Sequence, residues 1–118
     1  MNLTLFSEED FVTEPSANIC PVDEIEILGR KYKIELMGEV EDPESDGSMD
    51  LSSQAIKYRP APGADYNRDT IFHEITHAVD ETLLCELTER QVHLMATGLL
   101  SVLKQNPELI EWLCSNEQ

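Results

Sequence analysis

Two histidines four residues apart, with a glutamate directly after the first, have the spacing of a metal site: His73, Glu74 and His77. On a helix, residues four apart share a face with Cβ atoms about 5–6 Å apart, so both imidazoles can bind one Zn²⁺ at about 2.0–2.1 Å per bond. Glu74 would project beside the metal, where a carboxylate can take a proton from zinc-bound water and pass it to a leaving amine. The spacing predicts a zinc site with Glu74 as general base.

A zinc site of this kind needs a third protein ligand, and the next segment offers Glu86, Glu89 and His93. The last two are four residues apart and share a face of the second helix, which makes them the two main candidates. If the first helix ends at Leu83 and a second helix returns antiparallel at about 1.5 Å per residue, it reaches the level of His77 near His93. Glu89 needs a longer reach but completes the common set of two histidines and a glutamate. From the residues alone, both candidates stay open.

Asp80 lies three residues after His77, on roughly the same helix face. Metal-bound histidines usually donate their second ring N–H to a carboxylate or carbonyl. Asp80 could accept that hydrogen bond, and the alternative is an ordinary solvated carboxylate.

The first half of the chain contains the strand signals. Apolar residues alternate from Glu24 to Leu36 around Gly29-Arg30, which predicts a β-hairpin with one buried face. Residues 38–50 are rich in acids, with Pro43 and Gly47, and are typical of a loop. Residues 54–59 alternate again and predict a third strand, ended by the prolines that follow.

The second half predicts helices. Apolar residues fall at helical spacing from Ile71 to Leu83, on the side away from the histidines. Thr88 and Gln91 form a capping box that opens a second helix through Leu103, and Asn106-Pro107 begins a short last one. A further short helix is expected at residues 7–12. We expect the last helix to pack under the core through its apolar residues, Leu109, Ile110, Trp112 and Leu113.

These elements predict one α+β domain over residues 1–118. A small antiparallel or mixed sheet of about three strands comes first, and the helix with the histidines and one or two further helices follow it.

Composition limits the partners. The 118 residues include 24 Asp and Glu against 8 Lys and Arg, a formal charge of -16. Such a surface repels phosphate backbones and anionic membranes, so we expect basic protein partners and no direct nucleic-acid binding. No stretch resembles a signal peptide or a membrane span. The three cysteines are far apart and are expected to be free thiols in the cytoplasm.

Residues 70–80, 87–92 and 96–100 resemble small HExxH proteins encoded by phages and prophages, which look like minimal ImmA/IrrE-type metallopeptidases. The resemblance implies a zincin-like fold, a zinc ion, Glu74 as general base and a location in the host cytoplasm. It favours Glu89 as the third ligand. In zincins an edge strand before the active helix pairs with an extended substrate, and residues 54–59 would be that strand.

Two functions follow. The first is a zinc metallopeptidase that hydrolyses a peptide bond in a protein or peptide, such as a host regulatory protein with a basic surface. The alternative is a non-catalytic acidic interaction protein, an inhibitor or DNA mimic on a zincin-like scaffold, whose -16 charge would occupy a basic site.

Overall fold

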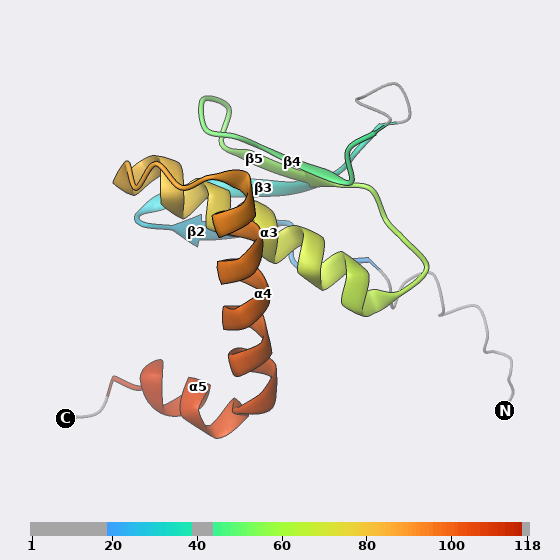
Figure 1. Ribbon diagram of the computed structural model, residues 1–118. Helices are drawn as coiled ribbons and strands as arrows, with labels where there is room; N and C mark the ends of the chain where they lie inside the picture. Colours follow the sequence, from blue (N-terminus) through green and yellow to red (C-terminus); the bar gives the residue numbers. More distant parts are fainter. Residues whose placement is uncertain (1–18, 39–43, 117–118) are drawn as a thin grey trace, which may run out of the picture.

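A mixed β-sheet with a long helix across one face organises the chain (Figure 1). The computed structural model describes residues 19–38 and 44–116. Within them lie four strands, β2 (Glu24–Ile27), β3 (Arg30–Leu36), β4 (Gly47–Asp50) and β5 (Ala55–Tyr58). Three helices follow, α3 (Ala64–Leu83), α4 (Glu89–Gln105) and α5 (Pro107–Leu113). The predicted α+β class is confirmed; the predicted helix at residues 7–12 lies outside the described residues.

The sheet has the order β2-β3-β5-β4. β2 and β3 form the predicted hairpin, which turns at Leu28 and Gly29. Both turn residues have positive φ, 51° and 84°, as the two-residue turns that suit twisted hairpins require. β5 pairs in parallel with β3 and antiparallel with β4, so the sheet is mixed. The predicted hairpin and third strand are confirmed.

Two expectations about the sheet were wrong. Residues 38–50 are not all loop, because β4 occupies their end. Residues 54–59 do not form an edge, because β5 lies between β3 and β4, which leaves β4 at one edge of the sheet that the structure describes. β4 offers only four residues and one large apolar side chain, Met49. Its pairing with β5, from Gly47 opposite Tyr58 to Asp50 opposite Ala55, specifies it instead.

The core forms where the sheet meets α3. Ile27, Tyr32 and Ile56 from the strands pack with Ala78 of α3, and Ile75 and Val79 of the same helix pack against them at helical spacing. The apolar side of α3 therefore faces the sheet, as the periodicity predicts. This packing fixes the helix that carries both histidines.

The prediction that α5 packs under the core was wrong. No residue of α5 is buried, and Trp112 and Leu113 are 71% and 60% exposed. The cause is the length and direction of α4, whose 17 residues span about 25 Å and lead away from the sheet (Figure 1).

None of the helices in the described residues has the length and apolar character needed to cross a membrane. All three cysteines are free, as predicted.

Candidate metal centre

α3 holds the two predicted histidines side by side. Their ring centroids are 4.8 Å apart, with the rings inclined at 71°. The side chains of His73 and His77 are 19% and 23% exposed, so both are half-buried and reachable from solvent. The i, i+4 spacing on a regular helix produces this pair.

After α3 the chain reverses direction through a loop held by Asp80. Leu84 ends the helix with φ 57°, and the N–H of Cys85 donates to the carbonyl of Asp80 at 3.1 Å. The N–H of Leu87 donates to the carboxylate of Asp80, also at 3.1 Å. Asp80 is only 7% exposed. Asp80 is therefore not a solvated carboxylate. Its carboxylate contacts the loop that leads to α4 and not an imidazole of the described residues.

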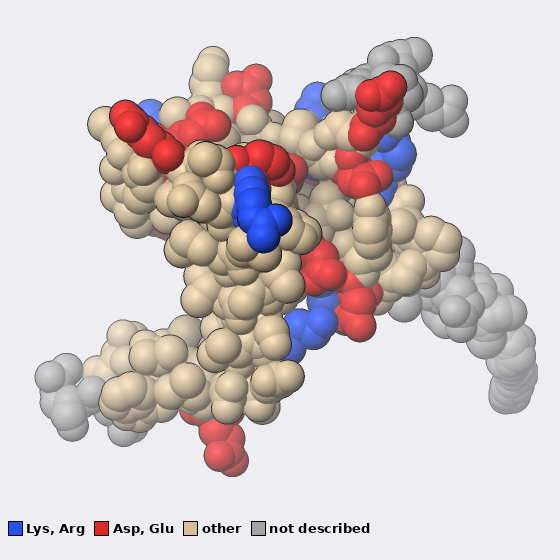
Figure 2. Space-filling model, viewed as in Figure 1, with Lys and Arg blue, Asp and Glu red and all other residues tan. Residues whose placement is uncertain are grey.

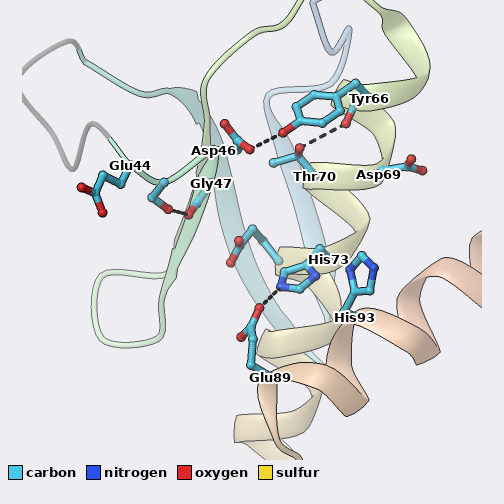
Figure 3. Close-up of a pocket in the computed structure, with 11 residues that line it drawn as sticks. Glu44, Asp46, Gly47, Tyr66, Asp69, Thr70, His73, Glu89 and His93 are labelled. Atoms are coloured by element: carbon cyan, nitrogen blue, oxygen red, sulfur yellow. Dashed lines mark hydrogen bonds and ion pairs between the residues drawn. The ribbon is translucent and has the colours of Figure 1, made fainter.

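α4 begins at Glu89, whose carboxylate contacts the two imidazoles. The predicted capping box is present: the Thr88 hydroxyl accepts from the Gln91 N–H at 3.1 Å, and the Gln91 side chain accepts from the Thr88 N–H at 2.9 Å. Glu89 Oε2 lies 2.8 Å from His73 Nε2 (Figure 3). Glu89 Oε1 lies 2.9 Å from His77 Nε2. One carboxylate thus contacts both histidines.

His93 lies one turn further along α4 and beside the site. Its ring centroid is 6.0 Å from that of His73, but it is not in the group of three whose ligand atoms lie within 4.8 Å of one another, His73, His77 and Glu89. The expectation that favoured His93 assumed a helical return at about 1.5 Å per residue. Residues 84–88 return outside a helix, where a chain covers up to about 3.3 Å per residue. The structure therefore brings Glu89 to the histidines.

The donor set suits zinc. Two imidazole nitrogens and a carboxylate oxygen are the ligands of many catalytic zinc sites, which keep the fourth position for water or substrate. In a tetrahedral zinc site neighbouring donor atoms are about 3.4 Å apart, and the 2.8 and 2.9 Å contacts need only a small separation to reach it. The three side chains fit a zinc ion, and their role as ligands stays a prediction.

The Glu74 side chain extends from α3 toward Gly47 of β4. It is 8% exposed, and burial raises the pKa of its carboxyl to about 7, with His77 lowering the pKa and the Glu89 carboxylate raising it again. A nearby cation would favour the charged form. Glu74 lines the same cavity as both histidines, about 310 Å³ in volume, so its carboxyl lies beside the candidate metal site.

Gly47 of β4 closes the site from the sheet side. A Cβ atom on Gly47 would lie 2.7 Å from Thr70 Cγ2, 3.2 Å from Glu74 Oε2 and 3.2 Å from the Lys57 carbonyl. Glycine is thus needed for the close approach of β4 to α3. The sequence did not predict this close approach of β4 to α3. The only signal for it was a glycine within an acidic segment.

We expect Gly47→Ala to destabilise the fold by about 1–3 kcal/mol, because the added methyl overpacks this contact. The Thr70 methyl cannot move cheaply, since its Oγ1 bonds the Tyr66 carbonyl at 3.1 Å and a β-branched side chain is stiff. Urea unfolding measures the loss. Gly47→Ala combined with Thr70→Ser, which deletes only that methyl, should regain part of it; no recovery would contradict the steric explanation.

The centre opens into a groove along β4. A cavity of about 390 Å³ lies at the Gly47 end, and a second of about 310 Å³ contacts the histidines. A third, of about 600 Å³, continues past Asp50. Neighbouring cavities share lining residues: Gly47, Glu74 and Glu89 join the first two, and Met49 and Glu81 join the last two. The three cavities therefore adjoin one another along β4 and beside the candidate metal centre, and together they are called the groove.

The chain was compared with protein-family models, with curated proteins and with solved structures. No family model, curated protein or solved structure matches the chain. The resemblance to HExxH peptidases therefore remains an expectation.

Proposed function

We propose that the chain is a zinc-dependent peptidase in which His73, His77 and Glu89 hold the metal and Glu74 is the general base. The observation that carries the proposal is the contact of a single carboxylate, that of Glu89, with both imidazoles of the HExxH helix at 2.8 and 2.9 Å. The three side chains come from two different helices, α3 and α4, and meet at one point.

Each residue has a distinct task in this proposal. When bound, zinc supplies a Lewis acid that activates water and polarises a carbonyl. The two histidines and Glu89 fix it and leave one side open to the groove. Glu74 receives the proton of the attacking water and delivers it to the leaving amine. Its low exposure, 8%, keeps that proton transfer away from bulk solvent.

β4 is suited to hold the substrate. Among residues 19–38 and 44–116 it lies at an edge of the sheet and pairs only with β5, so its other edge can pair with an extended peptide through backbone hydrogen bonds. The groove runs along this strand and past the histidines. We therefore assign to β4 the substrate-binding role first expected of residues 54–59.

The test is cleavage of a disordered protein, casein, by the purified chain, with products identified by mass spectrometry. We expect cleavage that stops after chelation and returns on addition of one equivalent of zinc, because the ligands remain in place without the ion. Cleavage by the fully chelated protein would overturn the proposal.

The alternative, an acidic interaction protein, has one observation in its favour. α3 carries five Asp and Glu against one Arg, whereas on the face shown in Figure 2 α4 and α5 are mostly uncharged. In that case a stable, salt-sensitive complex with a basic protein would survive both chelation and His73→Ala. Loss of the complex on His73→Ala would count against it.

A further inference from the structure

We propose that the groove selects a peptide with an arginine beside the cleaved bond, and that Asp46, Asp69 and Tyr66 bind this arginine. The inference rests on the proposed peptidase function, since it names the substrate class of the same site. It concerns the end of the groove at which β4 begins.

The cavity at this end is acidic and large enough for a side chain. Its volume of about 390 Å³ lies within the range of ligand pockets. Besides Glu74 and Glu89, three carboxylates line it, and no lysine or arginine of the described residues does: Glu44, Asp46 and Asp69. Such a concave surface concentrates a negative potential and attracts a cation.

A second observation points to a ligand in the same cavity. Glu74 lines it and is 8% exposed, yet its carboxylate makes no hydrogen bond to any described residue. Buried polar groups are normally hydrogen-bonded. The Glu74 carboxylate is therefore open to a group that enters the cavity, and this sets the cavity apart from an ordinary acidic surface.

Asp46 and Tyr66 provide the recognition geometry. The Tyr66 hydroxyl donates to Asp46 Oδ2, which orients the carboxylate and leaves Oδ1 as an acceptor. Tyr66 is 46% exposed. A guanidinium can stack on the Tyr66 ring while it donates to the carboxylate, whereas an ammonium is a point charge without a stacking plane. The pair therefore favours arginine over lysine.

Asp69 reinforces the charge from the other side. Figure 3 shows Asp46 and Asp69 to either side of Tyr66 and Thr70, with Asp46 and Tyr66 joined directly. Asp69 is exposed and contributes through the shared potential of the cavity. We therefore expect a larger effect from Asp46 than from Asp69.

The opposite end of the groove is less suited to a cation. Lys57 lines it together with Asp50 and Glu81. The Asp50 carboxylate already accepts from the N–H groups of Ser52 and Ser53, at 3.0 and 3.3 Å. This asymmetry assigns the arginine to the Asp46 end.

The experiment measures peptide binding on the Glu74→Gln variant loaded with zinc, so that no peptide is consumed. The probes are two labelled ten-residue peptides of Gly, Ser, Ala and Leu with capped ends, identical except for one central Arg or Gln. Fluorescence anisotropy gives both dissociation constants. We expect the Arg peptide to bind about tenfold more tightly, since each exposed carboxylate–cation pair contributes roughly two- to fivefold. The preference should shrink in 0.5 M salt.

Matched variants locate the effect. Asp46→Asn and Asp69→Asn should each lower the preference, and together they should reduce it to about one. Asn can still accept from Tyr66, so the local structure is kept. Asp23→Asn makes the same change just before β2, at the far edge of the sheet, and should leave the preference unchanged. Equal binding of both peptides, or a preference that survives the double variant, would overturn the inference.

A lysine peptide tests the stacking. We expect it to bind roughly two- to fivefold more weakly than the Arg peptide. Tyr66→Phe keeps the ring and should keep this difference, whereas Tyr66→Leu should remove it. Retention of the difference in Tyr66→Leu would contradict a role for the ring.

The two proposals can fail separately. If the Arg peptide is preferred but the wild-type chain cleaves neither peptide nor casein, the groove assignment stands and the peptidase fails. If casein is cleaved with no enrichment of arginine beside the cleaved bonds and no binding preference, the peptidase stands and the groove assignment fails.

Discussion

Glu74→Gln is expected to lower the rate of peptide cleavage at least about 100-fold while one zinc per chain remains bound. General acid–base catalysis contributes about 10²–10⁴-fold, and an amide cannot accept the proton. Glutamine has the same length, so the side chain can keep the place that Glu74 has beside Gly47. The rate of casein cleavage and the zinc content, both measured on the same sample, check the result.

The stability of this variant provides an internal control. The carboxyl of Glu74 is 8% exposed and its pKa is raised by burial, so an uncharged amide should leave the unfolding temperature unchanged or higher. Glu108→Gln on α5, far from the groove, should leave cleavage as in the wild type. Full cleavage by Glu74→Gln would contradict the assigned mechanism.

The helices could be predicted from the sequence because their signals are local. The period from Ile71 to Leu83 and the capping box of Thr88 and Gln91 depend only on residues within a turn or two of each other. HExxH belongs to this class, since its two histidines meet on any regular helix. The sequence therefore predicted both the position of the motif on a helix and the face of α3 that packs on the sheet.

β4 and the return loop could not be predicted, because their geometry depends on distant partners. β4 has four residues, and its pairing with β5 supplies what its own pattern lacks. Asp80 contacts Leu87, seven residues later, and this contact decides where Glu89 arrives. Similarly, the apolar residues of α5 indicate burial only if α4 leads back to the core, and it does not. Residues of β4 line the groove, so the groove could not be predicted either.

Substitution of any one of His73, His77 and Glu89 by alanine is expected to weaken zinc binding more than about 100-fold. Loss of a residue that merely supports a ligand costs about 10–100-fold, and loss of the ligand itself should exceed that. His93→Ala should bind zinc as the wild type does, because its ring lies outside the group of three. Elemental analysis after dialysis against a competing chelator measures zinc per chain.

Glu89→Ala separates the loss of a ligand from the loss of the fold. The capping box of Thr88 and Gln91 does not use the Glu89 side chain, so α4 should still begin at the same place. The Glu89 side chain is 71% exposed, and its ion pairs with the histidines contribute at most about 1 kcal/mol. The variant should therefore remain folded but lose the rise in unfolding temperature that zinc produces in the wild type. If Glu89→Ala kept its zinc and His93→Ala lost it, the ligand set would be His73, His77 and His93. The Glu89 carboxylate would then have another role.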